Sequence, residues 1–337
     1  MKINPKELTK ILQLVQPGLC KRTVLNQAKH FVFTGQDVIT FNDQISIKHL
    51  FQTDFPFSVS ADEFYSVISK IKHETCEIEI EGESIIISAK NTKSKLSIST
   101  DSYLISVVNN IKIPNKGWAF LPDNFIDAIS LCYFSASKDM TQGALSCLSI
   151  KDDKVFASDS IRIGFYKMSG VMSDEQILIP ATIISELKKY PIVEFLVDDQ
   201  WIHFRTTENI IFSSRILDAE FPDCLPFFNI KGSELILPIS LKEIIEECKE
   251  FYESQNDPSS KITISLDGKY LKCFSSKTNG WIEKKIIFPT DNKISFSINP
   301  VLFIEILEKT TKMIISLEEQ KALFISDNFK HIMCLPC

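Results

Sequence analysis

The two cysteines at the end of the sequence have the spacing that most resembles a chemical site. Cys334 and Cys337 form a C-x-x-C pair, which occurs in zinc sites and in thiol redox enzymes. Zinc usually takes four ligands, and the neighbouring His331 would add only one more. A redox C-x-x-C normally opens a helix, whereas this pair lies in the apolar segment KHIMCLPC. We therefore predict an ordinary apolar strand here and no metal site.

Residues for catalysis or nucleotide binding form no recognisable motif elsewhere. The five histidines and the pair Asp159 and Ser160 make no constellation for nucleophilic catalysis, and the H-E-x-x-H metal motif is absent. Only ten glycines occur, and neither G-x-G-x-x-G nor G-x-x-x-x-G-K-[ST] is found. The sequence thus predicts no catalytic residue, no enzyme and no cofactor.

Composition is that of a globular protein with a full core. The 337 residues predict two or three domains, and 44% of them are hydrophobic and 24% charged.

No apolar run reaches the roughly 18 residues of a membrane span, and MKINPKELTK carries charges where a signal peptide is apolar. The nine cysteines lack framework spacing and suit a reducing compartment. We expect a cytoplasmic protein with no membrane contact, whose net charge of −6 leaves room for a local basic face.

Six short amphipathic stretches have the pattern of helices with one apolar face. Five carry proline at or near the start, where its missing N–H would be unpaired anyway. Every second start is separated by nearly the same distance, 117 and 116 residues in one series and 119 and 120 in the other. The stretches are PKELTKILQLV, ADEFYSVISKI, PDNFIDAISLC, PATIISELKKY, PISLKEIIEEC and NPVLFIEILEK, with starts at Pro5, Ala61, Pro122, Pro180, Pro238 and Pro300.

Alternating segments joined by tight polar turns lie between these stretches and predict β-hairpins. They are HFVFTGQDVITF, EIEIEGESIII, LSIKDDKVFAS, EFLVDDQWIHF, ITISLDGKYLKCF and MIISLEEQKALFI. The turn residues Gly35, Asp152 and Gly268 each lie 30 residues after the start of their helix. Helices and hairpins therefore share one period of about 117 residues. We predict three similar α+β domains of two helix-plus-antiparallel-sheet halves each, spanning 1–116, 117–231 and 232–337.

Four segments resemble the bacterial sliding clamp, the beta subunit family of DNA polymerase III. VFASDSIRIGFYKM keeps Ala157, Asp159 and Arg162 of the clamp's A-T-D-x-H-R-L type of signature, and SSRILDAEFPDCLPFF keeps the F-P-D of its linker. FSINPVLFIEIL is similar to the segment that opens the last clamp helix, and IMCLPC to the closing strand. The many departures indicate a divergent clamp, of the kind that a bacteriophage would encode.

The resemblance implies a DNA clamp fold and a head-to-tail ring homodimer around double-stranded DNA. Such a ring is a processivity factor, since it tethers DNA polymerase to its template without reading sequence. In that family DNA polymerase and clamp loader bind by short peptide motifs. The alternative that the residues leave open is a repeat-built α+β interaction or scaffold protein that does not encircle DNA.

The resemblance also implies a groove for partner peptides, between the second and third domains. Its walls would come from the second domain, the domain linker, the last helix and the terminal strand. Carried over to this chain, the groove residues are Leu145, Ser158, Ser160, Ile161, Arg162, Ile163, Pro222, Phe227, Asn299, Leu302, Met333, Leu335 and Pro336. Ser160 and Ile161 depart from the family, which shows Gly or Ser followed by His, so an altered peptide preference is expected.

Basic residues on or beside the predicted helices are the candidates to face DNA. They are Lys10, Lys21, Arg22, Lys70, Lys72, Lys188 and Lys189. Phosphate attraction needs only positive charge at loose spacing, and the resemblance favours Arg22 in particular. The other reading is that helix lysines are simply solvated.

Ring closure is expected between an edge of the first domain and the third domain of a second copy. The basic edge carries Lys93, Lys95, Leu96 and Ile98, and the opposing acidic and aromatic surface carries Glu247, Glu250, Phe251 and Tyr252. Opposite charges around an apolar centre suit a specific interface. The alternative is an edge strand that its lysines protect from aggregation.

Overall fold

The computed structural model describes residues 1–20, 29–99, 108, 110–198, 200–251 and 261–336. Four residues named above lie outside these ranges, namely Lys21, Arg22, Tyr252 and Cys337. The chain forms two compact units, and each contains part of the predicted middle domain. Unit 1 consists of residues 1–121 and 183–216, and unit 2 of residues 122–182 and 217–337. The division into three domains stays a prediction.

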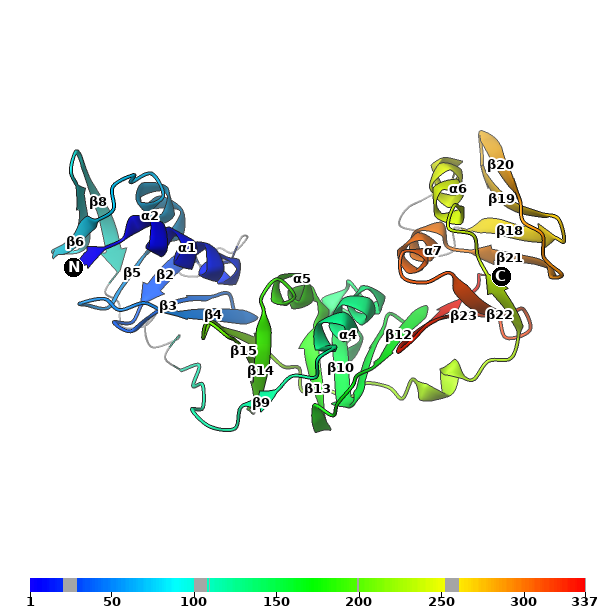
Figure 1. Cartoon of the computed structure of the whole chain (residues 1–337), viewed down its shortest axis with the longest axis horizontal. Helices are drawn as coiled ribbons and strands as arrows, with labels where there is room; N and C mark the ends of the chain where they lie inside the picture. Colours follow the sequence, from blue (N-terminus) through cyan, green and yellow to red (C-terminus); the bar gives the residue numbers. More distant parts are fainter. Residues whose placement is uncertain (21–28, 100–107, 109, 199, 252–260, 337) are drawn as a thin grey trace. The chain divides into compact units, whose positions relative to one another are not determined.

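Unit 1 is built on one antiparallel sheet of twelve strands (Figure 1). In sheet order these are β1 (Lys2–Ile3), β6 (Cys76–Glu81), β7 (Ser84–Ala89), β8 (Thr92–Ser99), β5 (Phe57–Ser60), β2 (His30–Phe33), β3 (Asp37–Phe41), β4 (Ile45–Leu50), β16 (Ile211–Arg215), β15 (Trp201–Thr206), β14 (Ile192–Val197) and β9 (Ala119–Phe120). The pairing of β4 with β16, in which Lys48 lies opposite Ile211, joins two segments that are far apart in the sequence. The twelve-stranded sheet thus contains hairpins from three of the predicted half-domains, namely β2–β3, β6–β7 and β14–β15.

The helices of unit 1 are α1 (Pro5–Val15), α2 (Ala61–Ile68) and α5 (Ile184–Leu187), with the 3₁₀ turn η1 (Gln16–Gly18). The 3₁₀ turn η5 (Ala181–Ile183) directly precedes α5, and only its last residue belongs to unit 1. Asn4 caps α1, because its side chain accepts hydrogen bonds from two N–H groups of the first turn. On α2, Phe64 is fully buried and packs against Phe33 and Phe57, which stack at 4.5 Å between ring centroids. Each such buried ring contributes roughly 1.5–3 kcal/mol, so the apolar faces hold these helices on the sheet.

Unit 2 contains two antiparallel sheets. The larger runs β13 (Ser173–Pro180), β10 (Cys147–Asp152), β11 (Lys154–Ser158), β12 (Arg162–Lys167), β24 (Phe329–Cys334), β23 (Lys321–Ser326), β22 (Lys312–Ser316) and β17 (Ser233–Ile236). The smaller runs β20 (Gly280–Ile287), β19 (Tyr270–Lys277), β18 (Ile262–Asp267) and β21 (Lys293–Ile298). Strand β24 pairs with β12 on one side and with β23 on the other, so residues 329–334 lie inside the larger sheet and not at its edge.

The helices of unit 2 are α4 (Phe125–Cys132), α6 (Leu241–Cys248) and α7 (Pro300–Leu307), with 3₁₀ turns η3 (Tyr133–Ser135), η4 (Met140–Ser146), η6 (Leu225–Phe228) and η7 (Lys249–Phe251). Helix α4 packs on β11 and β12, and α6 packs on α7 and β19. Gly164 permits the approach of α4 and η3, since a Cβ there would lie 2.7 Å from Ser135 Oγ and 3.4 Å from Cys132 Cα.

The structure confirms the six predicted helices and the six hairpins. The fourth helix differs most, because α5 has one turn and begins only after the 3₁₀ turn η5. Cys334 lies at the end of β24, so the apolar strand expected for this segment is also confirmed. In the described residues, no helix is long and apolar enough to cross a membrane.

Candidate functional site

Unit 2 contains a cavity of about 220 Å³ beside the linker that follows β16. Its wall is mostly apolar, and the described residues that form it include two cations and no carboxylate. The lining residues are Leu145, Ser158, Ser160, Ile161, Arg162, Ile163, Pro222, Cys224, Phe227, Lys321, Ile332 and Cys334. An apolar recess with a few polar groups is the usual form of a ligand site.

Strand register shows which face of the sheet carries the cavity. Ile163 lies opposite Ile332, and Cys334 opposite Lys321, so these four residues share one face. The linker covers the same face, because Phe228 packs on Phe165 at 5.6 Å between ring centroids. Linker residues are held there by a small buried cluster that includes Cys147, Leu178, Phe221 and Cys224. The cavity therefore lies between the sheet and the linker.

Eight of the thirteen predicted groove residues line this cavity. They are Leu145, Ser158, Ser160, Ile161, Arg162, Ile163, Pro222 and Phe227. They come from separate segments of the chain, which the fold brings together as the resemblance implied. Whether partner peptides bind there stays a prediction.

Met333 and Leu335 were expected in the groove wall, and the structure corrects this. Met333 is fully buried and lies opposite Arg162, and its side chain does not stand with those of Ile332 and Cys334 in the cavity wall. Leu335 is 7% exposed and likewise does not line the cavity. The wall is formed instead by Ile332 and Cys334, because the alternation of β24 runs one residue out of step with the expectation.

The three other expected residues also lie outside the cavity wall. Asn299 caps α7, since its side chain accepts hydrogen bonds from the N–H groups of Val301 and Leu302 at 3.0 and 3.2 Å. Leu302 and Pro336 are half-buried without lining the cavity. Asn299 thus has a structural role that its position before a helix already explains.

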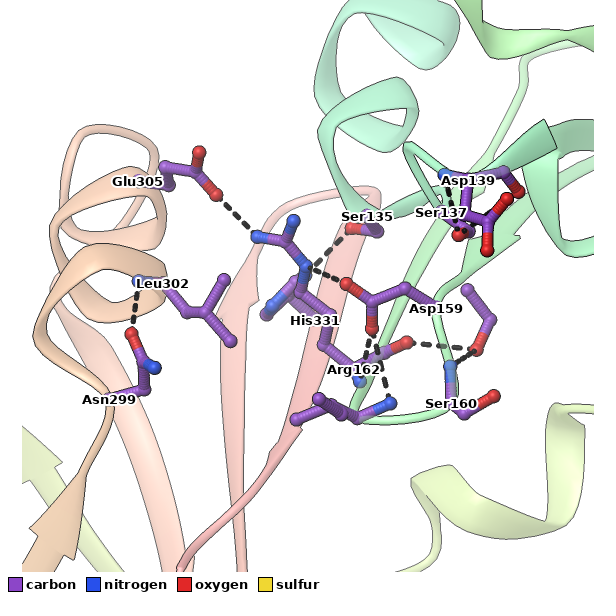
Figure 2. A network of polar contacts seen from close by, with 12 residues as sticks. Ser135, Ser137, Asp139, Asp159, Ser160, Arg162, Asn299, Leu302, Glu305 and His331 are labelled. Atoms are coloured by element: carbon purple, nitrogen blue, oxygen red, sulfur yellow. Dashed lines mark hydrogen bonds and ion pairs between the residues drawn. The ribbon is translucent and has the colours of Figure 1, made fainter. Parts of the chain in front are cut away.

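Arg162 reaches the cavity, but its guanidinium is held in a buried polar network (Figure 2). Its Nε donates to Asp159 at 2.9 Å, and its Nη1 donates to Glu305 of α7. The same guanidinium lies 5.4 Å from the centre of the Phe134 ring. With two carboxylates and an aromatic ring around it, this cation is already compensated within the chain.

His331 lies next to this network and is fully buried (Figure 2). Its Nδ1 is 3.2 Å from Ser135 Oγ, and its ring stacks on Phe134. Among the described residues, its Nε2 has no hydrogen-bond partner. Burial lowers the pKa of His331 well below its ordinary value, and the Arg162 charge lowers it further. The ring is therefore neutral at physiological pH.

Sequence reasoning missed four lining residues, namely Cys224, Lys321, Ile332 and Cys334. Because alternate residues of a strand share a face, Ile332 and Cys334 could have been predicted if the sheet face covered by the linker had been known. Burial raises the pKa of the Cys334 thiol, which is therefore uncharged. Lys321 carries no sequence signal, since it is one of many lysines that begin a strand after a turn.

A second cavity, of about 280 Å³, lies on the other side of Pro222 and Cys224. Its lining is more polar and includes Lys151, Asp152, Lys154 and Asp223. Lys154 Nζ lies 3.7 Å from Asp152 and 3.8 Å from Asp153. Its described lining holds two lysines and two aspartates, so it offers less selectivity for a charged ligand than the first cavity.

Solved structures of known proteins share this architecture over nearly the whole chain. The DNA polymerase III subunit beta of Pseudomonas aeruginosa superposes with a TM-score of 0.84 at 17% identity, covering 99% of both chains. The beta subunit from the DNA polymerase of Streptococcus pyogenes gives 0.85 at 16% identity, covering 99% of this chain and 98% of that one. The chain has the sliding-clamp fold.

At the level of sequence the similarity to sliding clamps is weak. The Beta sliding clamp of Bacillus subtilis (strain 168) is 25% identical over 209 residues, which are 57% of this chain and 51% of that protein. The match thus spans about half the length of this curated relative. No protein-family model matches the chain. Low identity with a shared fold agrees with the divergent character expected from the sequence.

On the sliding-clamp fold, the described lysines expected to face DNA are all exposed. These are Lys10, Lys70, Lys72, Lys188 and Lys189. Lys189 is paired with Glu186 at 2.8 Å, and Lys70 donates to Ser66 at 3.1 Å. Acidic residues such as Asp62 stand on the same helices. The helical surface is therefore only weakly basic.

The expected interface residues of this clamp fold are partly engaged within the chain. Lys95 pairs with Glu81 at 2.8 Å, Glu247 pairs with Lys284 of β20, and Lys277 donates to the Glu250 carbonyl at 3.0 Å. Phe251 lies under the Lys277 ammonium at 5.1 Å. Lys93 is exposed and Leu96 half-buried.

Ile98 was also expected at the interface, and the structure corrects this expectation. It is buried at 8% exposure where β8 joins β5, opposite Val59. The sheet of its own chain therefore covers it, and it is not available to a second copy.

Proposed function

We propose that this chain is a DNA sliding clamp, a cytoplasmic processivity factor that tethers a DNA polymerase to duplex DNA. The observation that carries the proposal is the sliding-clamp fold, which covers 99% of the chain. Such a protein acts by topology and catalyses no reaction. The apolar cavity at the linker and the exposed helix lysines support the proposal independently.

Two exposed strand edges support closure into a ring of two copies. In the described part of the chain, residues 92–97 of β8 pair with β7 alone. β20 is the last strand of its sheet, and its Trp281 and Ile287 are 67% and 74% exposed. Unpaired edges with apolar side chains tend to pair with another chain. A head-to-tail contact of β8 with β20 of a second copy, repeated once, closes the ring.

Double-stranded DNA would pass through this ring beside the helices. Lys10, Lys70, Lys72, Lys188 and Lys189, with Lys21 and Arg22, would attract its phosphates without regard to sequence. Because acidic residues stand among these lysines, we expect the attraction to be weak. Weak contact suits a ring that must slide.

The cavity between sheet and linker would receive short peptide motifs of DNA polymerase and of a clamp loader. Its volume of about 220 Å³ suits one or two apolar side chains. The same cavity would serve several partners in turn, since each needs only a short segment to bind.

Retention on circular DNA tests the proposal. The protein is placed on a nicked circular plasmid by slow ring opening at high concentration, and the complex is isolated by gel filtration in high salt. We expect protein to stay with the circle and to leave after one restriction cut, because a ring slides off free ends. Equal retention before and after the cut would contradict the proposal. No retention on either form would favour the scaffold protein that does not encircle DNA.

A further inference from the structure

Lys321 places a positive charge at the rim of the apolar cavity. It is the first residue of β23 and lies opposite Cys334 on the sheet face that the linker covers. Its side chain is 26% exposed, and its ammonium lies 5.6 Å from the centre of the Phe227 ring. Both Phe227 and Lys321 line the cavity. The charge therefore stands beside the apolar wall, where a bound ligand would meet it.

Arg162 cannot serve as a second cation for the ligand. Its guanidinium is 3% exposed and is already paired with Asp159 and Glu305. Among the lining residues that the structure describes, no carboxylate neutralises Lys321 from within the cavity. This described wall thus has one available cation and no competing anion.

The partner of Lys321 within the chain lies outside the cavity. Glu319, in the turn before β23, approaches the Lys321 ammonium at 3.3 Å, and its side chain is 37% exposed. Exposed ion pairs of this kind are weak. A carboxylate on a bound ligand can therefore replace Glu319 or share Lys321 with it.

We infer that the cavity selects peptides in which an acidic residue stands beside the apolar anchor, and that Lys321 is the residue that recognises this carboxylate. The inference rests on the proposed function and specifies the partner chemistry of the same groove. Apolar side chains fill the recess between Ile163, Ile332 and Phe227, and the neighbouring carboxylate meets Lys321 at the rim. A charged contact of this kind adds discrimination between partners more than bulk affinity.

A random heptapeptide library displayed on phage reveals the preference, because it samples acidic and apolar residues in every order. The library is selected on the wild-type protein, on Lys321→Gln and on Ile161→Lys, which alters the apolar wall. Lys330→Gln is the matched control, since Lys330 lies on the neighbouring strand β24 and does not line the cavity. We expect wild type and Lys330→Gln to enrich Asp or Glu next to Leu, Met or Phe, and Lys321→Gln to enrich only the apolar residues.

The outcomes separate the inference from the proposed function. Apolar peptides enriched with no acidic preference on the wild type would overturn the role of Lys321 and leave the groove in place. Peptides enriched equally on Ile161→Lys would show that the cavity is not the binding site, which overturns the role of Lys321 and the proposed peptide groove together; the retention of the protein on circular DNA tests the clamp itself.

Affinities then test the contact directly, with the most enriched acidic peptide and its Asp→Asn or Glu→Gln version. We expect the amide version to bind wild type about fivefold more weakly, and Lys321→Gln to bind both versions equally. Glu319→Gln should bind the acidic peptide more tightly than wild type, because Lys321 loses its competing partner. An unchanged preference in Lys321→Gln would overturn the inference.

Discussion

At the scale of single residues, His331 is the buried group most sensitive to protonation. Its ring is enclosed by Phe134, Ser135 and the Arg162 network, with no room for solvent to stabilise a charge. Protonation would add a second cation beside Arg162 in a buried site, and Nε2 has no acceptor there among the described residues. The folded protein therefore keeps this ring neutral.

The depressed pKa of His331 predicts a loss of stability in acid. The unfolded chain binds this proton near pH 6.5, and the folded chain binds it only well below that pH. The neutral ring therefore makes its full contribution to the free energy of unfolding above about pH 6.5, and this contribution is lost as the pH falls further. The loss approaches about 1.4 kcal/mol per pH unit for this one group. Urea unfolding at pH 7.5 and 5.5 measures it. We expect His331→Gln to lose less stability between the two pH values than wild type. Equal losses in both proteins would contradict the assignment.

Leu335 and Ile161 are expected to respond differently to the same substitution. Leu335 is 7% exposed, so Leu335→Lys should lower the free energy of unfolding by about 2 kcal/mol or more. Ile161 is half-buried in the cavity wall, and Ile161→Lys should change stability by less than about 1 kcal/mol. Peptide affinity should nevertheless fall at least about tenfold in Ile161→Lys. Urea unfolding and peptide titration check the pair, and an Ile161→Lys protein that binds peptide normally would remove the cavity from consideration.

Of the two ion pairs of Arg162, one could be predicted from the sequence and the other could not. Its partner Asp159 is three positions away, so a local turn with this ion pair can be anticipated. Its other partner, Glu305, belongs to a helix far along the chain. Only the folded arrangement of β12 against α7 reveals that this arginine is compensated and not free for a ligand.

At the scale of elements, local patterns predicted helices and hairpins well. Asn4 and Asn299 cap helices from the position before a proline, and the tight turns at Gly35 and Gly268 have positive φ as such turns require. Each signal needs only a few neighbouring residues. Helix α5 was the least accurate, because its first turn adopts 3₁₀ geometry after Pro180.

Pairing between distant strands could not be predicted from the same patterns. The contacts of β4 with β16 and of β12 with β24 join segments more than 160 residues apart. The residue pattern of a single strand does not identify the strand with which it pairs. The error over Met333 and Leu335 has this origin. Which face of β24 meets the linker depends on its register with β12, and a shift of one residue exchanges the two faces.

Close packing of α4 and η3 on β12 depends on Gly164. A Cβ at this position would meet Ser135 Oγ at 2.7 Å, so Gly164→Ala should cost about 1–3 kcal/mol through overpacking. Gly170→Ala is the matched control, because its Cβ would only touch Pro122 at 3.9 Å. Urea unfolding of both variants measures the difference. Equal stability of the two variants would mean that the α4 side of the sheet is not tightly packed.

At the scale of the whole molecule, encircling DNA requires a closed ring of more than one copy. The edge residues 92–97 of β8 and 280–287 of β20 are exposed or half-buried, and they carry the apolar and charged side chains that such a contact needs. Several of the charges already have partners in the same chain, as in the pair of Glu247 with Lys284. The proposed ring closure would therefore depend on strand pairing and on apolar contacts such as Leu96 and Trp281 more than on charge.

The mass of the native particle tests ring closure most directly. We predict that the wild type has about twice the chain mass of 38.4 kDa, measured by light scattering after gel filtration. Lys95→Glu combined with Leu96→Asp should give the mass of one chain, since burying unpaired carboxylates in the interface costs several kcal/mol. The control Lys72→Glu, an exposed change away from β8, should keep the double mass. A wild type that remains a single chain at micromolar concentration, or a double variant that keeps the mass of two chains, would contradict closure through β8.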